Sequence, residues 1–253
     1  MPNHPTLEIC VESVDHAVAA ERGGAHRLEL CSDLSSGGVT PSAGLMQTAR
    51  RHAKVPIHVL IRPRPGDFCY SDHELEIMRR DIETAKQLGM DGVVLGVLHA
   101  NNRVDIAQTK ALVQSATPLP VTFHRAFDTS HSLEASLEDV IQTGASRILT
   151  SGGASSAMDA LSILARLVQL SRGRILIMPC GGINSENVVP IARKTLAREF
   201  HTSVGTSRVA GASGDNGSPH GVGTSPSRPL SPAFEQQVAQ LVSLLDSVAT
   251  TNG

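Results

Sequence analysis

Short apolar runs recur along the chain and alternate with stretches of helical periodicity. The runs begin near Leu7, Arg27, Ile57, Gly92, Val121, Arg147, Arg174 and Glu199. Their starts are about 27 residues apart on average, which leaves room for one strand and one helix in each unit. Eight such units predict a single TIM-type (β/α)8 barrel spanning residues 1–253. An open doubly wound sheet is the competing fold, but no G-x-G-x-x-G sequence opens the chain.

Capping signals place several of the predicted helices. Residues 71–74 form a capping box, Ser-Asp-His-Glu, and Gly89 follows at the expected end of that helix. Thr40 and Pro41 predict an N-cap followed by a first-turn proline. Asp105 is expected to begin a helix and Gly144 to end one. The last helix is predicted from about Ala233, with its apolar face formed by Phe234, Val238, Leu241, Leu245 and Val248.

Two segments depart from this regular pattern. Pro190 falls inside a helical stretch at 185–194, where it should kink or shorten the helix. Between Ser203 and Pro232, 17 of 30 residues are Gly, Ser or Pro. This composition predicts a flexible loop at 203–232 before the last helix.

Strand alternation predicts which side chains point into the barrel. If the apolar residues pack against the helices, polar residues of five strands face the barrel axis. They are Glu8, Cys10 and Glu12; Arg27, Glu29 and Cys31; His58 and Arg62; Thr122 and His124; and Glu199, His201 and Ser203. Val, Ile and Leu dominate ordinary barrel interiors, and active sites lie where the strands end. Charged groups buried there are costly unless they pair or bind something.

Composition narrows the kind of ligand. The chain has five Phe, one Tyr and no Trp, which argues against aromatic platforms for nucleic acid and against membrane belts. A formal net charge of −2 gives no strong field toward nucleic acid or acidic lipid. Four cysteines, together with the lack of a targeting or membrane-spanning stretch, favour a cytoplasmic protein with free thiols. A small charged or metallic ligand is therefore expected.

Two strands share the pattern E-x-C, which brings Cys10 and Cys31 to neighbouring inward positions. Adjacent strands are about 4.8 Å apart. Two sulfur–metal bonds of about 2.3 Å span about 4.6 Å, so the thiols are close enough to clamp one soft ion. Two thiolates suit Cu(I) better than Mg²⁺ or Ca²⁺. The alternatives are small buried hydrophobes or a disulfide, and Cys69 and Cys180 are further candidate ligands.

The inward carboxylates and basic groups have several interpretations, one of which is that Glu8 and Glu29 are ligands of a hard metal ion. Glu8, Glu29, Arg62 and His124 are candidate catalytic residues, with the carboxylates and the imidazole moving protons. The alternative is a structural network in which Glu8 and Glu29 pair with Arg62 and Arg125. His58 lies deeper in its strand and is interpreted as structural.

Small-residue turns follow the later strands and suggest an anion site. Barrel phosphate sites commonly use the loops after strands seven and eight, where glycine lets backbone N–H groups approach an anion. The candidate residues are Arg125, Asp128, Gly152, Gly181, Gly182 and Ser203. Ordinary turns built on Gly-Gly pairs are the alternative.

Taken together, these motifs resemble the CutC copper-homeostasis family over residues 7–203. The resemblance rests on residues 8–13 (EICVES), 29–31 (ELC), 37–42 (GGVTPS), 61–64 (IRPR), 66–68 (GDF), 70–71 (YS), 91–94 (DGVV), 122–128 (TFHRAFD), 149–152 (LTSG) and 181–183 (GGI). It implies a cytosolic, usually homo-oligomeric TIM barrel that binds Cu(I) through two inward cysteines. Those cysteines match Cys10 and Cys31. The chain departs from the family at Pro65 and Cys180, where glycine is usual, and at Cys69, where the family tends to be apolar.

Two functions follow as expectations, beside a third interpretation in which the protein is a scaffold used through oligomer contacts. The first is copper homeostasis, with Cu(I) held by Cys10 and Cys31 and no organic cofactor implied. The second is an enzyme of isomerase, lyase or hydrolase type that acts on a small phosphorylated, sugar-like anion. In neither case is nucleic acid or a membrane expected as a partner.

Overall fold

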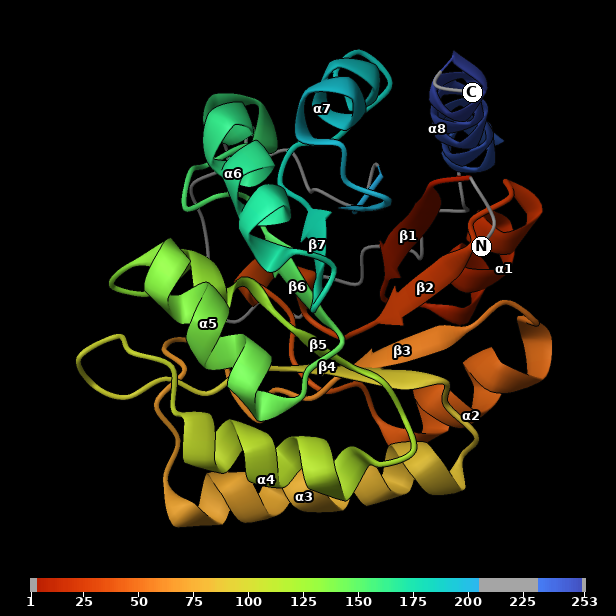
Figure 1. The fold of residues 1–253 in the computed structure, drawn as a ribbon. Helices are drawn as coiled ribbons and strands as arrows, with labels where there is room; N and C mark the ends of the chain where they lie inside the picture. Colours follow the sequence, from red (N-terminus) through yellow and green to blue (C-terminus); the bar gives the residue numbers. More distant parts are fainter. Residues whose placement is uncertain (1–3, 205–231, 252–253) are drawn as a thin grey trace, which may run out of the picture.

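Eight parallel strands surrounded by helices form the framework of the protein (Figure 1). The computed structural model describes residues 4–204 and 232–251. The strands are β1 (Thr6–Val11), β2 (Arg27–Leu30), β3 (Ile57–Leu60), β4 (Gly92–Leu95), β5 (Val121–Phe123), β6 (Arg147–Thr150), β7 (Leu176–Pro179) and β8 (Glu199–Thr202). The helices are α1 (Val14–Arg22), α2 (Ala43–His52), α3 (Asp72–Gln87), α4 (Ile106–Ala116), α5 (Leu133–Thr143), α6 (Leu161–Ser171), α7 (Val188–Thr195) and α8 (Pro232–Thr251).

The strands form one sheet in the order β7-β6-β5-β4-β3-β2-β1-β8. From β1 to β7 each strand pairs with the next one in sequence, and β1 also pairs with β8, so the first and last strands lie side by side. Among the described strands, β7 and β8 contact one another without a shared backbone ladder. The prediction of a TIM-type barrel is confirmed, with one seam between β7 and β8.

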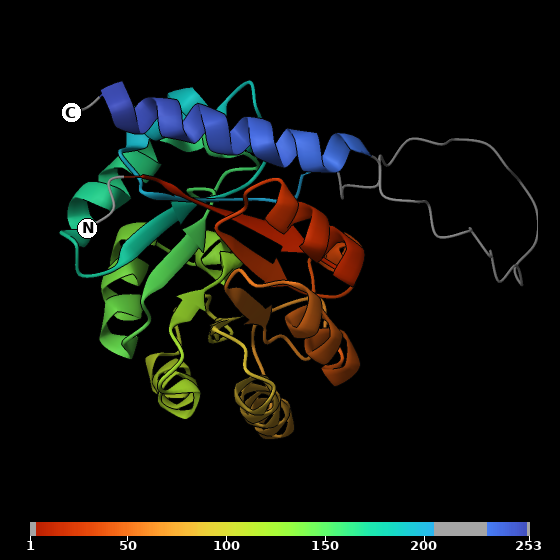
Figure 2. The ribbon, with the colours of Figure 1, turned by 90° about the vertical axis from the view of Figure 1, so that its right-hand side faces the viewer.

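Three short 3-10 turns follow strand ends: η1 (Leu34–Ser36), η2 (Arg125–Thr129) and η3 (Ala157–Ala160). The long helix α8 lies across one side of the barrel and packs on α1 and α7 (Figure 2). The predicted apolar face of α8, which includes Phe234, is buried. The loop predicted at 203–232 lies almost wholly outside the described residues.

The main core lies between the barrel and its helices. Outward strand residues such as Leu7, Ile9 and Leu28 are fully buried there against helix residues such as Ala17 and Met46. This is the packing that strand alternation predicts. A second core cluster, which includes Phe123 and Phe127, lies beside β5 and β6. The polar residues of the same strands face the barrel interior and form the site described below.

The capping signals were accurate at most positions. Ser71 and Glu74 form the predicted capping box, Asp105 caps α4, and Gly144 ends α5 in the left-handed conformation. Pro190 shortens its helix as expected, because α7 begins only at Val188. The proline then lies in the first turn, where its missing N–H removes no intrahelical bond.

The predicted N-cap at Thr40 was wrong. The N-cap is Ser42, two residues later, and its side chain accepts a hydrogen bond from the Leu45 N–H at 3.1 Å. The Thr40 hydroxyl instead accepts the backbone N–H of Arg62 at 2.9 Å. Thr40 therefore ties its loop to the end of β3.

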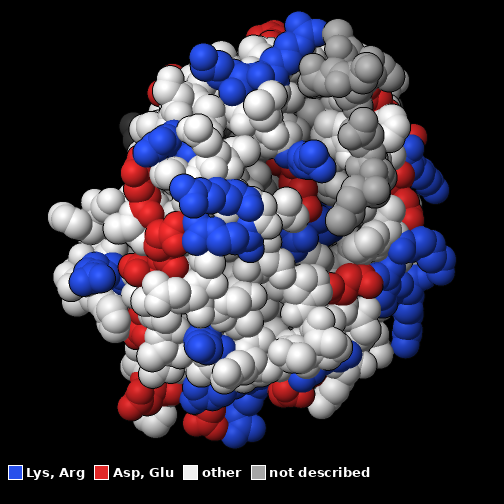
Figure 3. All heavy atoms as spheres, viewed as in Figure 1, with Lys and Arg blue, Asp and Glu red and all other residues white. Residues whose placement is uncertain are grey.

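Charged residues of both signs are interspersed on the face shown in Figure 3. In the described part of the chain, no helix combines the length and apolar character required to cross a bilayer.

Candidate functional site

Cys10 and Cys31 lie together at the carboxyl ends of β1 and β2. Their Sγ atoms are 3.5 Å apart, and both side chains are buried. They share a small apolar cluster with Leu60 and Val94, against which Leu34 of η1 packs. All four cysteines of the chain are free, so the pair is a dithiol. The predicted proximity of the two thiols is confirmed, at a shorter distance than the strand spacing suggested.

The turn over the dithiol contains Leu34, Gly37 and Gly38. The Glu12 carboxylate accepts the backbone N–H of Leu34 at 2.6 Å. Gly37 and Gly38 follow with positive φ angles of 88° and 83°. A Cβ on Gly38 would lie 2.7 Å from a Leu60 methyl group and 3.8 Å from the Cys31 sulfur. Glycine at this position therefore permits the turn to close tightly over the thiols.

Sheet register places a carboxyl group beside the thiols. Cys10 pairs with Glu29 across the β1–β2 ladder, and the Cys10 thiol lies 3.6 Å from Glu29 Oε1. The hydrogen bond to Cys31, burial and the nearby Glu29 raise the pKa of Cys10 well above its ordinary value. Burial also raises the pKa of Glu29. A metal ion bound by the Cys10 sulfur must displace the thiol proton.

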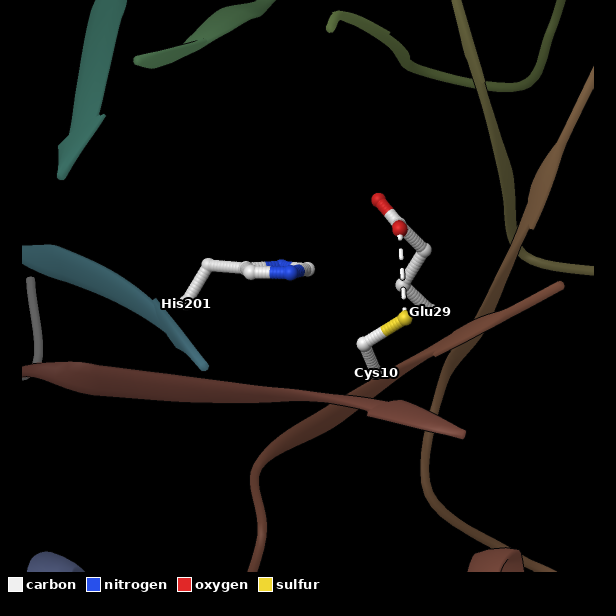
Figure 4. Close-up of side chains that lie close together, drawn as sticks. All are labelled: Cys10, Glu29 and His201. Atoms are coloured by element: carbon white, nitrogen blue, oxygen red, sulfur yellow. Dashed lines mark hydrogen bonds between the residues drawn. The ribbon is translucent and has the colours of Figure 1, made fainter. Parts of the chain in front are cut away.

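Cys10, Glu29 and His201 each offer one ligand atom to a common point. These three atoms lie within 4.8 Å of one another, and all three residues are buried (Figure 4). They come from the adjacent strands β1, β2 and β8. His201 was noted as inward-facing from the sequence, but no role was assigned to it.

Below this cluster, Glu8 is the centre of a buried ionic network. Its side chain is fully buried, bonds the Arg27 guanidinium and lies 2.7 Å from His201 Nδ1. Although burial opposes ionisation, Arg27 and His201 hold the pKa of Glu8 well below its usual range. Arg27 also pairs with Glu199 at 2.5 Å, and Glu199 contacts Arg147 at 3.0 Å. The network therefore alternates in charge along the barrel interior.

The expected pairing of Glu8 and Glu29 with Arg62 or Arg125 was wrong. The partner of Glu8 is Arg27, because the two residues are opposite one another in the β1–β2 ladder. Arg62 lies beyond the end of β3 and donates to the loop carbonyls of Gly38 and Gly66 at 2.8 and 2.7 Å. Its guanidinium also stacks over Phe68, 4.9 Å from the ring centroid. Strand alternation had already predicted that Arg27 faces the barrel interior, and this was the sequence signal for its pairing with Glu8.

His124 is buried and lies beside Phe68, the ring over which Arg62 stacks. Its ring centroid is 4.8 Å from that of Phe68, and its Nδ1 accepts the backbone N–H of Ala126. Burial, reinforced by Arg62, lowers the pKa of His124 to about 3. The imidazole is therefore neutral, with its proton on Nε2, and Nε2 is buried without a hydrogen-bond partner among the described residues. His58, expected to be structural, is buried against Gly92 with a pKa of about 3.

Several of the residues predicted to hold phosphate lie at the turn that follows β6, and Gly181 is next to Ser151 of that turn. Asp128 pairs with Arg125 at 2.9 Å and accepts backbone N–H bonds from Ser151 and Gly153. It also accepts bonds from the hydroxyl groups of Thr150 and Ser151. The Asp128 carboxylate thus already accepts the hydrogen bonds that the donors of the turn after β6 could give to a phosphate.

The other predicted phosphate residues lie around this turn and after the last two strands. Gly152 donates its N–H to the Thr150 hydroxyl at 2.9 Å. Gly181 and Gly182 form a left-handed turn after β7, with φ angles of 91° and 67°. Ser203 directly follows β8. Cys180 packs with Leu149 and Met178, and Cys69 is half-buried beside the second core cluster. Neither cysteine belongs to the Cys10 group.

The chain matches the model of the CutC family over residues 5–206. The human copper homeostasis protein cutC homolog is 48% identical over 205 residues, which cover 81% of this chain and 75% of that protein. The CutC family protein of Chromobacterium violaceum is 47% identical over 197 residues, which cover 78% of this chain and 80% of that protein.

Solved structures agree with the sequence match. The putative copper homeostasis protein CutC from Streptococcus agalactiae superposes with a TM-score of 0.75 at 32% identity, covering 79% of this chain and 98% of that one. Thiamine phosphate pyrophosphorylase from Pyrococcus furiosus, at 15% identity, has a TM-score of 0.60 and shares the fold alone. The extent of the family match and the level of identity establish that this chain belongs to the CutC family.

Proposed function

We propose that the protein serves copper homeostasis by binding Cu(I) between Cys10 and Cys31. The observation that supports this most directly is a free dithiol with a sulfur–sulfur distance of 3.5 Å. Two soft sulfur donors in an apolar cluster match the preference of Cu(I) over hard cations. The human and Streptococcus relatives, both named for copper homeostasis, support the same assignment.

The dithiol is closer together than a straight sulfur–metal–sulfur bridge of about 4.6 Å requires. Binding a two-coordinate ion would therefore separate the sulfurs by about 1 Å. Leu34, which is only half-buried, packs on this cluster and borders the space needed for that adjustment. Both thiols lose their protons when the ion binds. We further propose a cytoplasmic, homo-oligomeric protein, following the family resemblance.

A competition titration against a colorimetric Cu(I) chelator tests the proposal. Wild type should bind one Cu(I) more tightly than micromolar, and Cys10→Ser and Cys31→Ser should each weaken binding more than about tenfold, because one thiolate is a poor site for Cu(I). Cys180→Ser, which removes another buried cysteine, is the matched control and should bind like wild type. Affinity no tighter than micromolar, or unchanged in both variants, contradicts the proposal.

A second candidate function is binding, and turnover, of a small phosphorylated anion beside His124. The specific observation in its favour is the buried Nε2–H of His124, which lacks a partner among the described residues. Arg62 stacks on the same Phe68 ring and supplies positive charge nearby. In this function Glu8 and Glu29 would move protons, and the turn at Gly181 and Gly182 would hold the phosphate.

Thermal unfolding with a pentose phosphate tests this second function. The ligand should raise the melting temperature of wild type and of Cys31→Ser, because ligand binding to the folded state stabilises it. It should have no effect on His124→Asn, which removes the ring. If no sugar phosphate stabilises wild type at millimolar concentration, this candidate fails.

A further inference from the structure

The cluster of Cys10, Glu29 and His201 has the donor set of a different metal. A thiolate, a carboxylate and an imidazole together are typical ligands of Zn²⁺. Mg²⁺ and Ca²⁺ prefer oxygen ligands alone. The three ligand atoms lie within 4.8 Å of one another on three adjacent strands, and Cys31 does not belong to this group.

We propose that Cys10, Glu29 and His201 form a site for a divalent cation of the Zn²⁺ class. The protein would supply three ligands and leave a fourth position open. In zinc proteins that position is filled by water or by an oxygen of a substrate. The proposed copper site also uses Cys10, but the divalent site does not depend on copper binding, because its other ligands are different residues.

The distance between the sulfur and oxygen ligand atoms of the cluster fits a tetrahedral ion. Zinc bonds of about 2.3 Å to sulfur and about 2.1 Å to oxygen at the tetrahedral angle place the two ligand atoms about 3.6 Å apart. The observed distance between Cys10 Sγ and Glu29 Oε1 is 3.6 Å. The same pair is joined by the dashed line in Figure 4, where the His201 ring points toward it.

Glu29 has unused capacity to bind a cation. Its Oε2 atom is buried and has no hydrogen-bond partner among the described residues. A buried carboxyl oxygen without a partner is costly for the folded protein. A cation that binds both oxygens of this carboxylate would satisfy Oε2.

His201 is oriented as a metal ligand would be. Its Nδ1 lies 2.7 Å from the Glu8 carboxylate, which is itself fixed by Arg27. Because this contact occupies Nδ1, Nε2 is the ring nitrogen left to bind a metal. Metal-binding histidines in proteins usually have such a carboxylate behind them, which fixes the ring and its tautomer. Arg27 and Glu8 would therefore act as positioning residues.

Titration of the metal-free protein with Co²⁺ tests the site. Cobalt replaces zinc and reports its ligands: tetrahedral coordination gives strong visible absorption, and a thiolate adds a near-ultraviolet charge-transfer band. We expect both signals from wild type, with one Co²⁺ bound per chain and displaced by Zn²⁺. His201→Asn and Glu29→Gln should each weaken Co²⁺ and Zn²⁺ binding by at least about 100-fold, the upper end of the effect of losing an outer-shell partner.

Matched variants separate this site from the copper site. His58→Asn removes another buried histidine that lies near Glu8 but outside the cluster, and should leave Co²⁺ affinity unchanged. Cys31→Ser should lose Cu(I) and keep Co²⁺, whereas His201→Asn and Glu29→Gln should keep Cu(I). Thermal unfolding without metal establishes that each variant is folded. If His201→Asn does not fold, the Co²⁺ affinity of Glu29→Gln, the most conservative change, tests the site.

Several outcomes would overturn the inference. The inference fails if wild type does not bind Co²⁺ more tightly than micromolar, or if the bound Co²⁺ shows only the weak absorption of six-coordinate cobalt. It also fails if the cobalt signals persist in Glu29→Gln. Loss of the signals in Cys31→Ser would also overturn it, because that result would place both thiols in the divalent site. Failure of wild type to bind Cu(I), with the cobalt results as expected, contradicts the proposed copper function and supports the divalent site.

Discussion

Replacing Arg27 with methionine is expected to destabilise the protein by about 3–5 kcal/mol, because it leaves buried carboxylates without their main cation. Glu8 is fully buried and depends on Arg27 for its ionised state. Glu199 retains Arg147, so most of the loss is expected to arise at Glu8. Urea denaturation of wild type and Arg27→Met at neutral pH measures the difference in the free energy of unfolding.

Two further variants test whether the loss of stability in Arg27→Met arises from the unpaired Glu8 carboxylate. Arg174→Met removes an exposed partner of Glu138 and should cost less than about 1 kcal/mol, since surface pairs contribute little. Glu8→Gln combined with Arg27→Met should recover part of the lost stability, because the unpaired charge is gone. An Arg27→Met protein that is as stable as Arg174→Met would show that Glu8 does not need this partner.

Replacing Asp128 with alanine should cost at least about 3 kcal/mol, because several hydrogen bonds to one charged group are lost together. The carboxylate accepts the N–H groups of Ser151 and Gly153, two hydroxyl groups and the Arg125 guanidinium. Without it, these donors surround a space that suits an anion. Thermal and urea unfolding measure the loss of stability.

Inorganic phosphate distinguishes this explanation from a general packing defect. An anion bound in the emptied turn would stabilise Asp128→Ala, so phosphate should raise the melting temperature of this variant more than that of wild type. Asp159→Ala, which removes a neighbouring exposed carboxylate, is the control and should respond like wild type. An equal phosphate response in wild type and Asp128→Ala would contradict the view that Asp128 occupies the anion position.

The sequence predicted the barrel and its inward-facing residues because both depend on local patterns. Alternation within a strand requires only that apolar residues meet the helices, and it placed Glu8, Cys10, Arg27 and His201 correctly. The offset between neighbouring strands is a property of the closed sheet rather than of any one strand. That offset sets Cys10 opposite Glu29, and Glu8 opposite both Arg27 and His201.

Arg62 shows the other limit of the sequence. Its partners are carbonyl groups in two loops, one of which turns through the left-handed residues Gly37 and Gly38. The path of such a loop decides whether an arginine at a strand end reaches a carboxylate or a backbone oxygen. Asp128 is similar, because its bonds to the β6 turn depend on the 3-10 turn that contains it. Residue types and alternation alone do not determine either arrangement.

The pairing of β1 with β8 has a consequence for the synthesis of the protein. Glu8 and His201 are separated by 193 positions in the chain, yet they share a hydrogen bond. Because the chain emerges from its amino terminus, β1 is made long before the strand that completes its surroundings. Until residue 201 has emerged, Glu8 lacks one partner and the dithiol lies at an open sheet edge. The charged interior is therefore completed only after β8 has been made.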